Sequence, residues 1–282
     1  MRQIAVNAKI PASAKLGPFC VIGENVTLGE NVTLGAGCVL ADNVTLGADT
    51  ICGNHVTIAQ AASLGERVQL GDHTVVYENS RLGSGCFIGS NSSIGRLPRP
   101  ASTSTVKVQA GLPALEMGEG GIVGCSVTLY AGSVYGERVF VGDGAVVRER
   151  CKIQENVVIG SGVVVENDTS IGAFSKIQTG AYITAYMEIA ERVFIAPMVT
   201  TTNDNFMGRT EKRLKLVKGP VIGRGARVGG GAILLPGVKV APETFIAAGA
   251  LVTKDTEPGR VIKGFPARTV REVPAEEKLP EK

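Results

Sequence analysis

The feature of this sequence that most constrains its fold is an aliphatic residue that returns at every sixth position. One run of this step begins at Ile4 and ends at Ile94, and Cys52 is its only member that is not Ile, Leu or Val. Two further runs cover residues 123–195 and 222–252. A step of six does not fit the 3.6-residue period of an α-helix, whereas it preserves the two-residue alternation of a β-strand. The runs therefore predict short strands rather than helices.

Each six-residue repeat has the same internal pattern. The fourth position after the aliphatic residue is small or β-branched, as in Val26, Val32 and Cys38. The third position is rich in Asn, Gly, Asp and His, which tolerate a positive φ at a turn. Each repeat is thus interpreted as a short strand and a corner, and three repeats close one triangular coil. We predict an all-β fold, a parallel β-helix of about 12 coils.

Two breaks in the register divide the chain. Coils are expected at residues 1–95 and 121–252, with excursion loops at 96–120 and 200–220. The first loop is marked by three prolines, and loops that leave a rigid scaffold often carry function. Residues 253–282 leave the register and are expected to cap the open end of the helix.

Composition excludes several classes of protein. The net charge of +3 gives no global basic field for nucleic-acid binding. The N-terminus lacks an apolar signal region, and no stretch of 18 apolar residues occurs, so we expect a cytoplasmic protein without membrane insertion. The six cysteines are not arranged as a disulfide framework or a zinc site, and most occupy inward positions of the repeats, which favours buried structural thiols.

The repeat resembles that of the hexapeptide-repeat acyltransferases. The likeness covers residues 4–252, and the segments 229–238, 247–255 and 264–268 resemble the C-terminal coils and terminal signature of that family. The resemblance implies a left-handed β-helix, a homotrimer and active sites between subunits. Outward residues such as Thr27, Thr33 and Thr45 would then supply packing surface.

Residues 176–209 are similar to a subgroup that acetylates an amine on nucleotide-linked amino sugars. The Thr-Asn-Asp element of that subgroup matches Thr202, Asn203 and Asp204, and its coil asparagine matches Asn156. A histidine found in many members aligns with Tyr130 here, which leaves the proton acceptor open. The resemblance implies an acyl-CoA-dependent N-acyltransferase, with Asp204, Asn203 and Asn156 as candidate catalytic residues.

The same resemblance implies a site for coenzyme A, or acetyl-CoA, along the C-terminal coils. Bare corners at Gly230, Gly231 and Ala248 let a pantetheine arm approach the backbone. Cations in the exit segment are the candidates for its phosphates, namely Lys254, Lys263 and Arg268. An acyl carrier protein is the alternative donor.

Histidine placement favours an amine as the acceptor. A sugar hydroxyl needs a strong, positioned base to attack a thioester, usually His. The chain has only His55 and His73, which should stack on neighbouring coils far from the 200–220 loop. Two histidines are also too few for a three-histidine metal site, so no metal is expected. The alternatives are O-acylation of a sugar or serine-like hydroxyl, and a non-catalytic scaffold or regulatory module.

Overall fold

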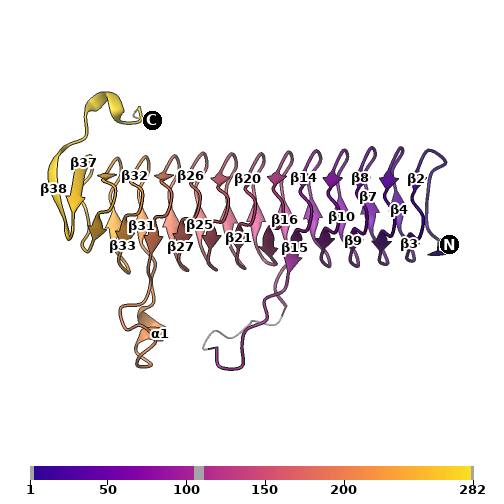
Figure 1. Cartoon of the computed structure of the whole chain (residues 1–282), viewed down its shortest axis with the longest axis horizontal. Helices are drawn as coiled ribbons and strands as arrows, with labels where there is room; N and C mark the ends of the chain where they lie inside the picture. Colours follow the sequence, from indigo (N-terminus) through magenta and orange to yellow (C-terminus); the bar gives the residue numbers. More distant parts are fainter. Residues whose placement is uncertain (1–2, 105–110, 281–282) are drawn as a thin grey trace. The chain divides into compact units, whose positions relative to one another are not determined.

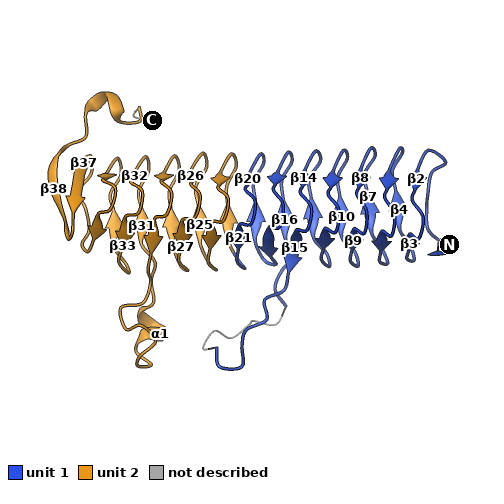
Figure 2. Cartoon of the chain, in the orientation of Figure 1, with its two compact units in different colours: residues 1–150 blue, residues 151–282 orange. Residues whose placement is uncertain are grey.

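The computed structural model describes residues 3–104 and 111–280. The chain divides into two compact units, residues 1–150 and residues 151–282 (Figure 2). In each unit, short strands fall in turn on three parallel sheets, which we name A, B and C (Figure 1). This confirms the predicted all-β parallel β-helix. Counted over the described residues, the sheets hold 13, 11 and 14 strands, close to the expected coil number.

In unit 1, every third strand belongs to the same sheet. Sheet A contains β1 (Gln3–Ile4), β3 (Val21–Ile22), β6 (Val39–Leu40), β9 (Thr57–Ile58), β12 (Val75–Val76), β15 (Ser93–Arg96), β18 (Thr128–Tyr130) and β21 (Val146–Val147). Sheet B contains β4 (Thr27–Leu28), β7 (Thr45–Leu46), β10 (Ser63–Leu64), β13 (Arg81–Leu82), β16 (Glu116–Met117) and β19 (Val134–Tyr135). Sheet C contains β2 (Lys15–Leu16), β5 (Thr33–Leu34), β8 (Ile51–Cys52), β11 (Gln69–Leu70), β14 (Phe87–Ile88), β17 (Ile122–Val123) and β20 (Phe140–Val141).

Unit 2 repeats this order. Sheet A contains β24 (Val164–Val165), β27 (Tyr182–Ile183), β30 (Thr200–Thr201), β33 (Ile233–Leu234) and β36 (Leu251–Val252). Sheet B contains β22 (Lys152–Ile153), β25 (Ser170–Ile171), β28 (Glu188–Ile189), β31 (Val221–Ile222) and β34 (Lys239–Val240). Sheet C contains β23 (Val158–Ile159), β26 (Lys176–Ile177), β29 (Phe194–Ile195), β32 (Arg227–Val228), β35 (Phe245–Ile246), β37 (Arg260–Gly264) and β38 (Ala267–Glu272).

The repeated aliphatic residues form the core. In a typical strand, Val39 faces outward and is 38% exposed, whereas Leu40 points inward and is 1% exposed. Equivalent residues stack directly, because Leu28 pairs with Leu46 and Leu46 with Leu64. Burial of each such side chain contributes about 1.5–3 kcal/mol. The expected outward threonines also face away from the core: Thr45 is exposed, and Thr27 and Thr33 are partly exposed.

The corners and the cysteines follow the sequence pattern. The turn position adopts a positive φ at Asn25 (55°), His55 (55°) and Asn156 (56°), as the residue types predicted. Five of the six cysteines are buried, and Cys125 is exposed. Burial raises the pKa of the Cys38 thiol to about 11, so this thiol stays protonated and structural.

Both excursions are shorter than predicted. The first lies between β15 and β16, and the coil resumes at Leu115 and Met117, both buried, rather than after residue 120. Its residues 105–110 lie outside the described part of the chain. The coil at β16 escaped prediction because Met117 stands out of step with the run that ends at Ile94. The second excursion lies between β30 and β31 and contains α1 (Arg213–Leu216). Neither described helix is long and apolar enough to cross a membrane.

The C-terminal segment first continues the coil and then turns back. Val261 and Ile262 pair in parallel with β35 and are buried, so the coils extend beyond residue 252. Strand β38 then pairs antiparallel with β37, forming a hairpin at the end of unit 2 (Figure 1). The tail that follows contains a short 3-10 helix, η1 (Ala275–Glu277). The segment is therefore coil, hairpin and tail, rather than a separate cap alone.

Candidate active site

The corners of unit 2 separate the candidate residues into three groups. We name each corner by the sheets that it connects. Asn203 and Asp204 lie in the AB connection after β30, and Asn156 lies in the BC corner after β22. Gly230 and Ala248 lie in CA corners, after β32 and β35. Within one chain, the structure thus places the predicted acceptor and donor residues on different corners.

The excursion of residues 202–220, which we call the acceptor loop, is closed at its base by backbone hydrogen bonds. The Lys218 N–H donates to the Asn203 carbonyl oxygen at 3.0 Å. The Gly237 N–H then donates to the Lys218 carbonyl oxygen at 2.9 Å, which ties the end of the loop to the next coil. Asn203 is therefore held at the point where the loop leaves the wall.

The carboxylate of Asp204 organises the first turn of the acceptor loop. Its oxygens accept hydrogen bonds from the backbone N–H groups of Phe206 (2.8 Å) and Gly208 (3.0 Å), and from Arg213 Nη1 (3.2 Å). The hydrogen bonds from Gly208 and Phe206, together with Arg213, hold the pKa of Asp204 below its usual value. The group is thus a stable anion near neutral pH and a weak proton acceptor, which favours positioning over general-base catalysis.

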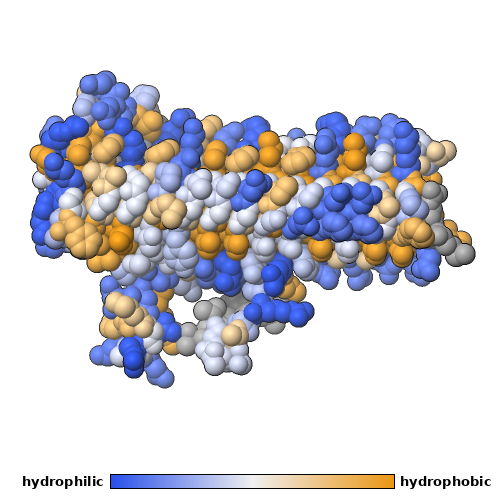
Figure 3. Space-filling model, in the orientation of Figure 1, coloured by the Kyte–Doolittle hydropathy of each residue, from blue (hydrophilic) through white to orange (hydrophobic). Residues whose placement is uncertain are grey.

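The rest of the acceptor loop is basic. Arg213 is engaged by Asp204, but Arg209, Lys212, Lys215 and Lys218 form no ion pair with any described residue. Figure 3 shows this excursion as a mostly hydrophilic lobe with a small apolar patch. Leu214 and Leu216 are 60% and 59% exposed there. The loop therefore presents several cations to an anionic ligand.

The CA corners, where the pantetheine track was predicted, expose backbone at two glycines. A side chain at Gly229 would clash with the backbone of Ala248 in the next coil, so this glycine is required by coil packing. Gly231 and Gly249 instead have a positive φ (66° and 67°), and no atom lies within 4 Å of where a Cβ would stand. An extended ligand can therefore approach the wall closely at Gly231 and Gly249.

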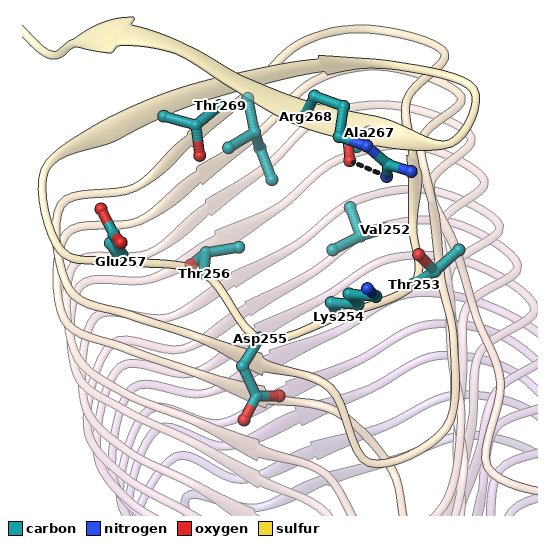
Figure 4. Close-up of a pocket in the computed structure, with 10 residues that line it drawn as sticks. Val252, Thr253, Lys254, Asp255, Thr256, Glu257, Ala267, Arg268 and Thr269 are labelled. Carbon is teal, nitrogen blue, oxygen red and sulfur yellow. Dashed lines mark hydrogen bonds between the residues drawn. The ribbon is translucent and has the colours of Figure 1, made fainter.

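A cavity of about 260 Å³ lies between the last coil and the C-terminal hairpin (Figure 4). Lys254 lines it from the segment after β36, and Arg268 lines it from β38. Lys263 is the cross-strand partner of Arg268 in the hairpin. Lys254 and Arg268 therefore line one cavity, together with the acids Asp255 and Glu257, whereas Lys263 lies beside Arg268 in the hairpin and outside the cavity lining.

Asn156 lines a shallow hollow on the BC corner that the sequence reasoning missed. The hollow is completed by residues from the next two coils, namely Phe174, Lys176, Arg192, Val193 and Phe194. Arg192 Cζ lies 4.9 Å from the centre of the Phe174 ring. Asn156, Phe174 and Arg192 occupy the same position in three successive coils, so an alignment of the sequence with itself, shifted by one coil, would have indicated that they lie side by side.

Tyr130, which aligns with the histidine of the subgroup, lies in unit 1. Its ring is contacted by two guanidinium groups, Arg96 at 5.7 Å and Arg148 at 5.0 Å. Arg148 is also paired with Glu149, whose side chain is only 2% exposed. The surroundings of Tyr130 are therefore a packed cation and aromatic cluster.

The two histidines stack as predicted. The rings of His55 and His73 lie 5.2 Å apart and are inclined by 8°. Among the described residues, no group of three or more His, Cys, Asp or Glu side chains has the arrangement of a metal site.

Comparison with known proteins places these features in context. Residues 132–167 match the family described as bacterial transferase hexapeptide (six repeats), and residues 16–51 and 150–185 match the hexapeptide repeat of succinyl-transferase. The chain therefore contains hexapeptide repeats in both of its units. The resemblance inferred from the six-residue step is confirmed.

The hexapeptide-repeat protein also resembles parts of curated enzymes. It is 34% identical over 88 residues to a galactoside O-acetyltransferase of Escherichia coli K12, covering 30% of this chain and 43% of that enzyme. It is 49% identical over 55 residues to a putative serine acetyltransferase of Schizosaccharomyces pombe, covering 20% of each. The chain thus spans less than half the length of these relatives. A perosamine N-acetyltransferase from Caulobacter crescentus, solved with CoA and GDP-perosamine, shares 20% identity over 52% of this chain and 57% of that one, with a TM-score of 0.34.

Proposed function

We propose that this hexapeptide-repeat protein transfers an acyl group from acyl-CoA to the amine of a nucleotide-linked amino sugar. The observation that carries the proposal is the cavity beneath the C-terminal hairpin, where Lys254 and Arg268 converge and Lys263 lies beside Arg268. The names of the curated relatives, all acetyltransferases, support acyl transfer.

The donor is proposed to lie along the CA corners of unit 2. Its phosphates pair with Lys254, Lys263 and Arg268, since charge-assisted hydrogen bonds to phosphate are among the stronger polar contacts. Its pantetheine arm extends past Gly230, Gly231 and Ala248, at corners where no atom lies within 4 Å of a Cβ position on Gly231 or Gly249. This arrangement presents the thioester carbonyl at the coil surface.

The acceptor amine is proposed to be positioned by Asn203 and Asp204 at the base of the acceptor loop. The amine nitrogen bonds to the thioester carbonyl carbon, the C–S bond breaks, and the thiolate takes up the proton released by the nitrogen. Because a neutral amine is already nucleophilic, positioning supplies much of the rate. An ionised Asp204 suits that role, since it can accept a hydrogen bond from the amine without taking its proton.

The separation of these groups on three corners motivates the proposed assembly. Asn156 stands on the BC corner, whereas the acceptor loop leaves the AB connection. A residue on one corner meets a residue on another when copies of the chain pack side by side around a threefold axis. We therefore propose a homotrimer in which neighbouring copies complete each site.

O-acylation of a sugar is the second candidate. The relative that favours it is the galactoside O-acetyltransferase, which matches over 88 residues. Unit 2 contains no histidine to activate a hydroxyl, and the two histidines of the chain both lie in unit 1. This distribution favours the amine.

Thioester cleavage against matched acceptors tests the proposal. Each nucleotide-linked amino sugar is paired with its analogue that has a hydroxyl in place of the amine, and we expect turnover only with the amine. The double substitution Lys263→Ala and Arg268→Ala should raise the donor KM about tenfold and change kcat little, because both groups bind the donor equally in the ground and transition states. Arg271→Ala is the control, because Arg271 lies on the same strand as Arg268 but is paired with Val261 and does not line the cavity.

Three results would count against the proposal. Faster acylation of the hydroxyl analogues would favour O-acylation. An unchanged donor KM in the double variant would remove the hairpin from the donor site. Absence of cleavage with every donor and acceptor would favour a non-catalytic scaffold.

A further inference from the structure

The hollow on the BC corner of unit 2 has the features of a binding site. Its volume is about 330 Å³, at the lower end of the range for small-ligand sites. Three consecutive coils build it, so its walls are fixed by the rigid stack rather than by a flexible loop. The Phe174 N–H donates to the Glu155 carbonyl oxygen at 3.2 Å, and the Arg192 N–H donates to the Ala173 carbonyl oxygen at 2.9 Å.

The two cations of the hollow are Lys176 and Arg192. Among the described residues, neither Lys176 nor Arg192 has a carboxylate within ion-pair distance. The arginines of the following coil, in contrast, are paired with carboxylates. Arg224 is paired with Glu191 at 3.0 Å, and Arg227 is paired with Glu277 at 3.0 Å. Glu277 of the tail thus pairs with Arg227, and Glu191 of the coil wall pairs with Arg224, whereas no described carboxylate pairs with the cations of the hollow.

The same hollow exposes two aromatic rings. Phe174 is 45% exposed and Phe194 is 39% exposed. The guanidinium of Arg192 is aligned against the Phe174 ring. Half-exposed rings beside unpaired cations are suited to a ligand that is flat and apolar at one end and anionic at the other. A sugar or an acyl chain alone does not match this combination.

We propose that this hollow binds a nucleoside diphosphate, with the base against Phe194 and the phosphates on Lys176 and Arg192. Asn156, at the edge of the hollow, supplies an amide that can donate to or accept from the base or ribose. The inference rests on the proposed function in one respect, since it assigns this ligand to the nucleotide part of the acceptor. Asn156 then contributes to binding the acceptor and not to the chemical step.

Calorimetric titration of the full chain with UDP and with GDP, without any acyl donor, tests this site directly. We expect at least one of them to bind, and Arg192→Gln or Lys176→Gln to weaken it about tenfold, because each removes a charge-assisted hydrogen bond. Phe194→Leu should weaken nucleotide binding about tenfold, because it removes base stacking. The same variant should weaken the binding of inorganic pyrophosphate only slightly. Lys152→Gln removes a lysine that is also exposed, from sheet B of the same unit, and should change nothing.

Several outcomes would overturn the site. If neither nucleotide binds, or if Lys152→Gln weakens binding as much as Lys176→Gln, the hollow is not the site. If pyrophosphate binds as tightly as the nucleotides, the hollow is a simple anion site. If the three variants dissociate an oligomer in light scattering while nucleotide affinity is unchanged, the surface is an interface between copies. Melting temperatures of all variants exclude general unfolding as the cause.

Failure of this site is separable from failure of the proposed function. Acyl transfer to nucleotide-linked amino sugars with no loss in the hollow variants would retain the enzyme and reject the site. Nucleotide binding that depends on Lys176 and Arg192, without any acyl transfer, would retain the site and reject the enzyme. When both hold, the hollow variants raise the acceptor KM and leave the donor KM unchanged.

Discussion

Two carboxylate–guanidinium pairs show how the coil wall and the acceptor loop use the same interaction differently. In unit 1, Arg148 Nε lies 2.9 Å from Glu149 Oε2, and the Glu149 side chain is 2% exposed. In unit 2, Arg213 Nη1 lies 3.2 Å from Asp204 Oδ2, and the Asp204 side chain is 16% exposed. The first pair is built into a coil corner beside Tyr130, whereas the second spans a loop that leaves the wall. The difference predicts a structural role for Glu149 and a functional one for Asp204.

The largest expected effect is on stability, at Glu149. Glu149→Ala removes the carboxylate that pairs with Arg148 beside the coil wall, and we expect the free energy of unfolding to fall by about 2 kcal/mol. The loss is smaller than for a completely buried pair because Arg148 is 30% exposed. The midpoint of urea denaturation measures it. Turnover per folded molecule should stay near the wild-type value, and a specific loss of turnover would contradict the structural role.

The next effect is on turnover, at Asp204. Asp204→Asn removes the ion pair with Arg213 and the charge that accepts two backbone hydrogen bonds, so the first turn of the acceptor loop loses its fixed geometry. We expect kcat/KM for the acceptor to fall at least about tenfold, with a small change in urea midpoint.

Arg213→Gln is the matched partner variant. Because the two residues act as a pair, kcat/KM for the acceptor should fall little further in the double variant than in either single variant. Strict additivity of the two losses, or an unchanged kcat/KM in Asp204→Asn, would place the functional carboxylate elsewhere.

The coil wall was predictable from sequence, whereas the sites were largely not. The six-residue step predicts inward residues such as Leu40 and the positive φ at Asn25, because both are determined within one repeat. Strand β16 was not predicted from the sequence, because the first excursion shifts the register and Met117 stands where a branched aliphatic residue was expected. Periodicity is informative only where the step is unbroken.

Contacts between distant segments account for the rest. The sequence identified Lys254 and Arg268 as cations near the exit, but only the hairpin of β37 and β38 places them around one cavity. The pairing of Asp204 with Arg213 depends on how the acceptor loop folds, and no repeat constrains that loop. The proposed nucleotide hollow needed a comparison across coils, since its residues belong to three different repeats.

A smaller effect is expected at acid pH, where protonation of Asp204 should make the acceptor loop easier to cleave. The folded pKa of Asp204 is lowered, so its stabilising contribution is complete above the ordinary value of 3.8 and is lost as the pH falls through the folded value. Pepsin cleavage of the loop should therefore accelerate a few-fold in wild type between roughly pH 4 and pH 2. Asp204→Asn should already be cleaved rapidly at pH 4 and change less, and parallel profiles of the two proteins would contradict the assignment.

The smallest expected effect is at the histidines, and it decides whether the functional site belongs to unit 2. His55 and His73 both occupy positive-φ corners, where Asn is also well tolerated, so replacing both by Asn preserves the coil. The stack they form, with ring centres 5.2 Å apart, lies in unit 1, whereas the proposed donor and acceptor residues belong to unit 2. If the acceptor is an amine positioned by the acceptor loop, no histidine is required, and turnover should change by less than about twofold. Its pH profile should also keep its shape, because no histidine takes part in the proposed reaction. Loss of turnover in His73→Asn alone would move the chemistry to unit 1 and reverse the roles assigned to Glu149 and Asp204.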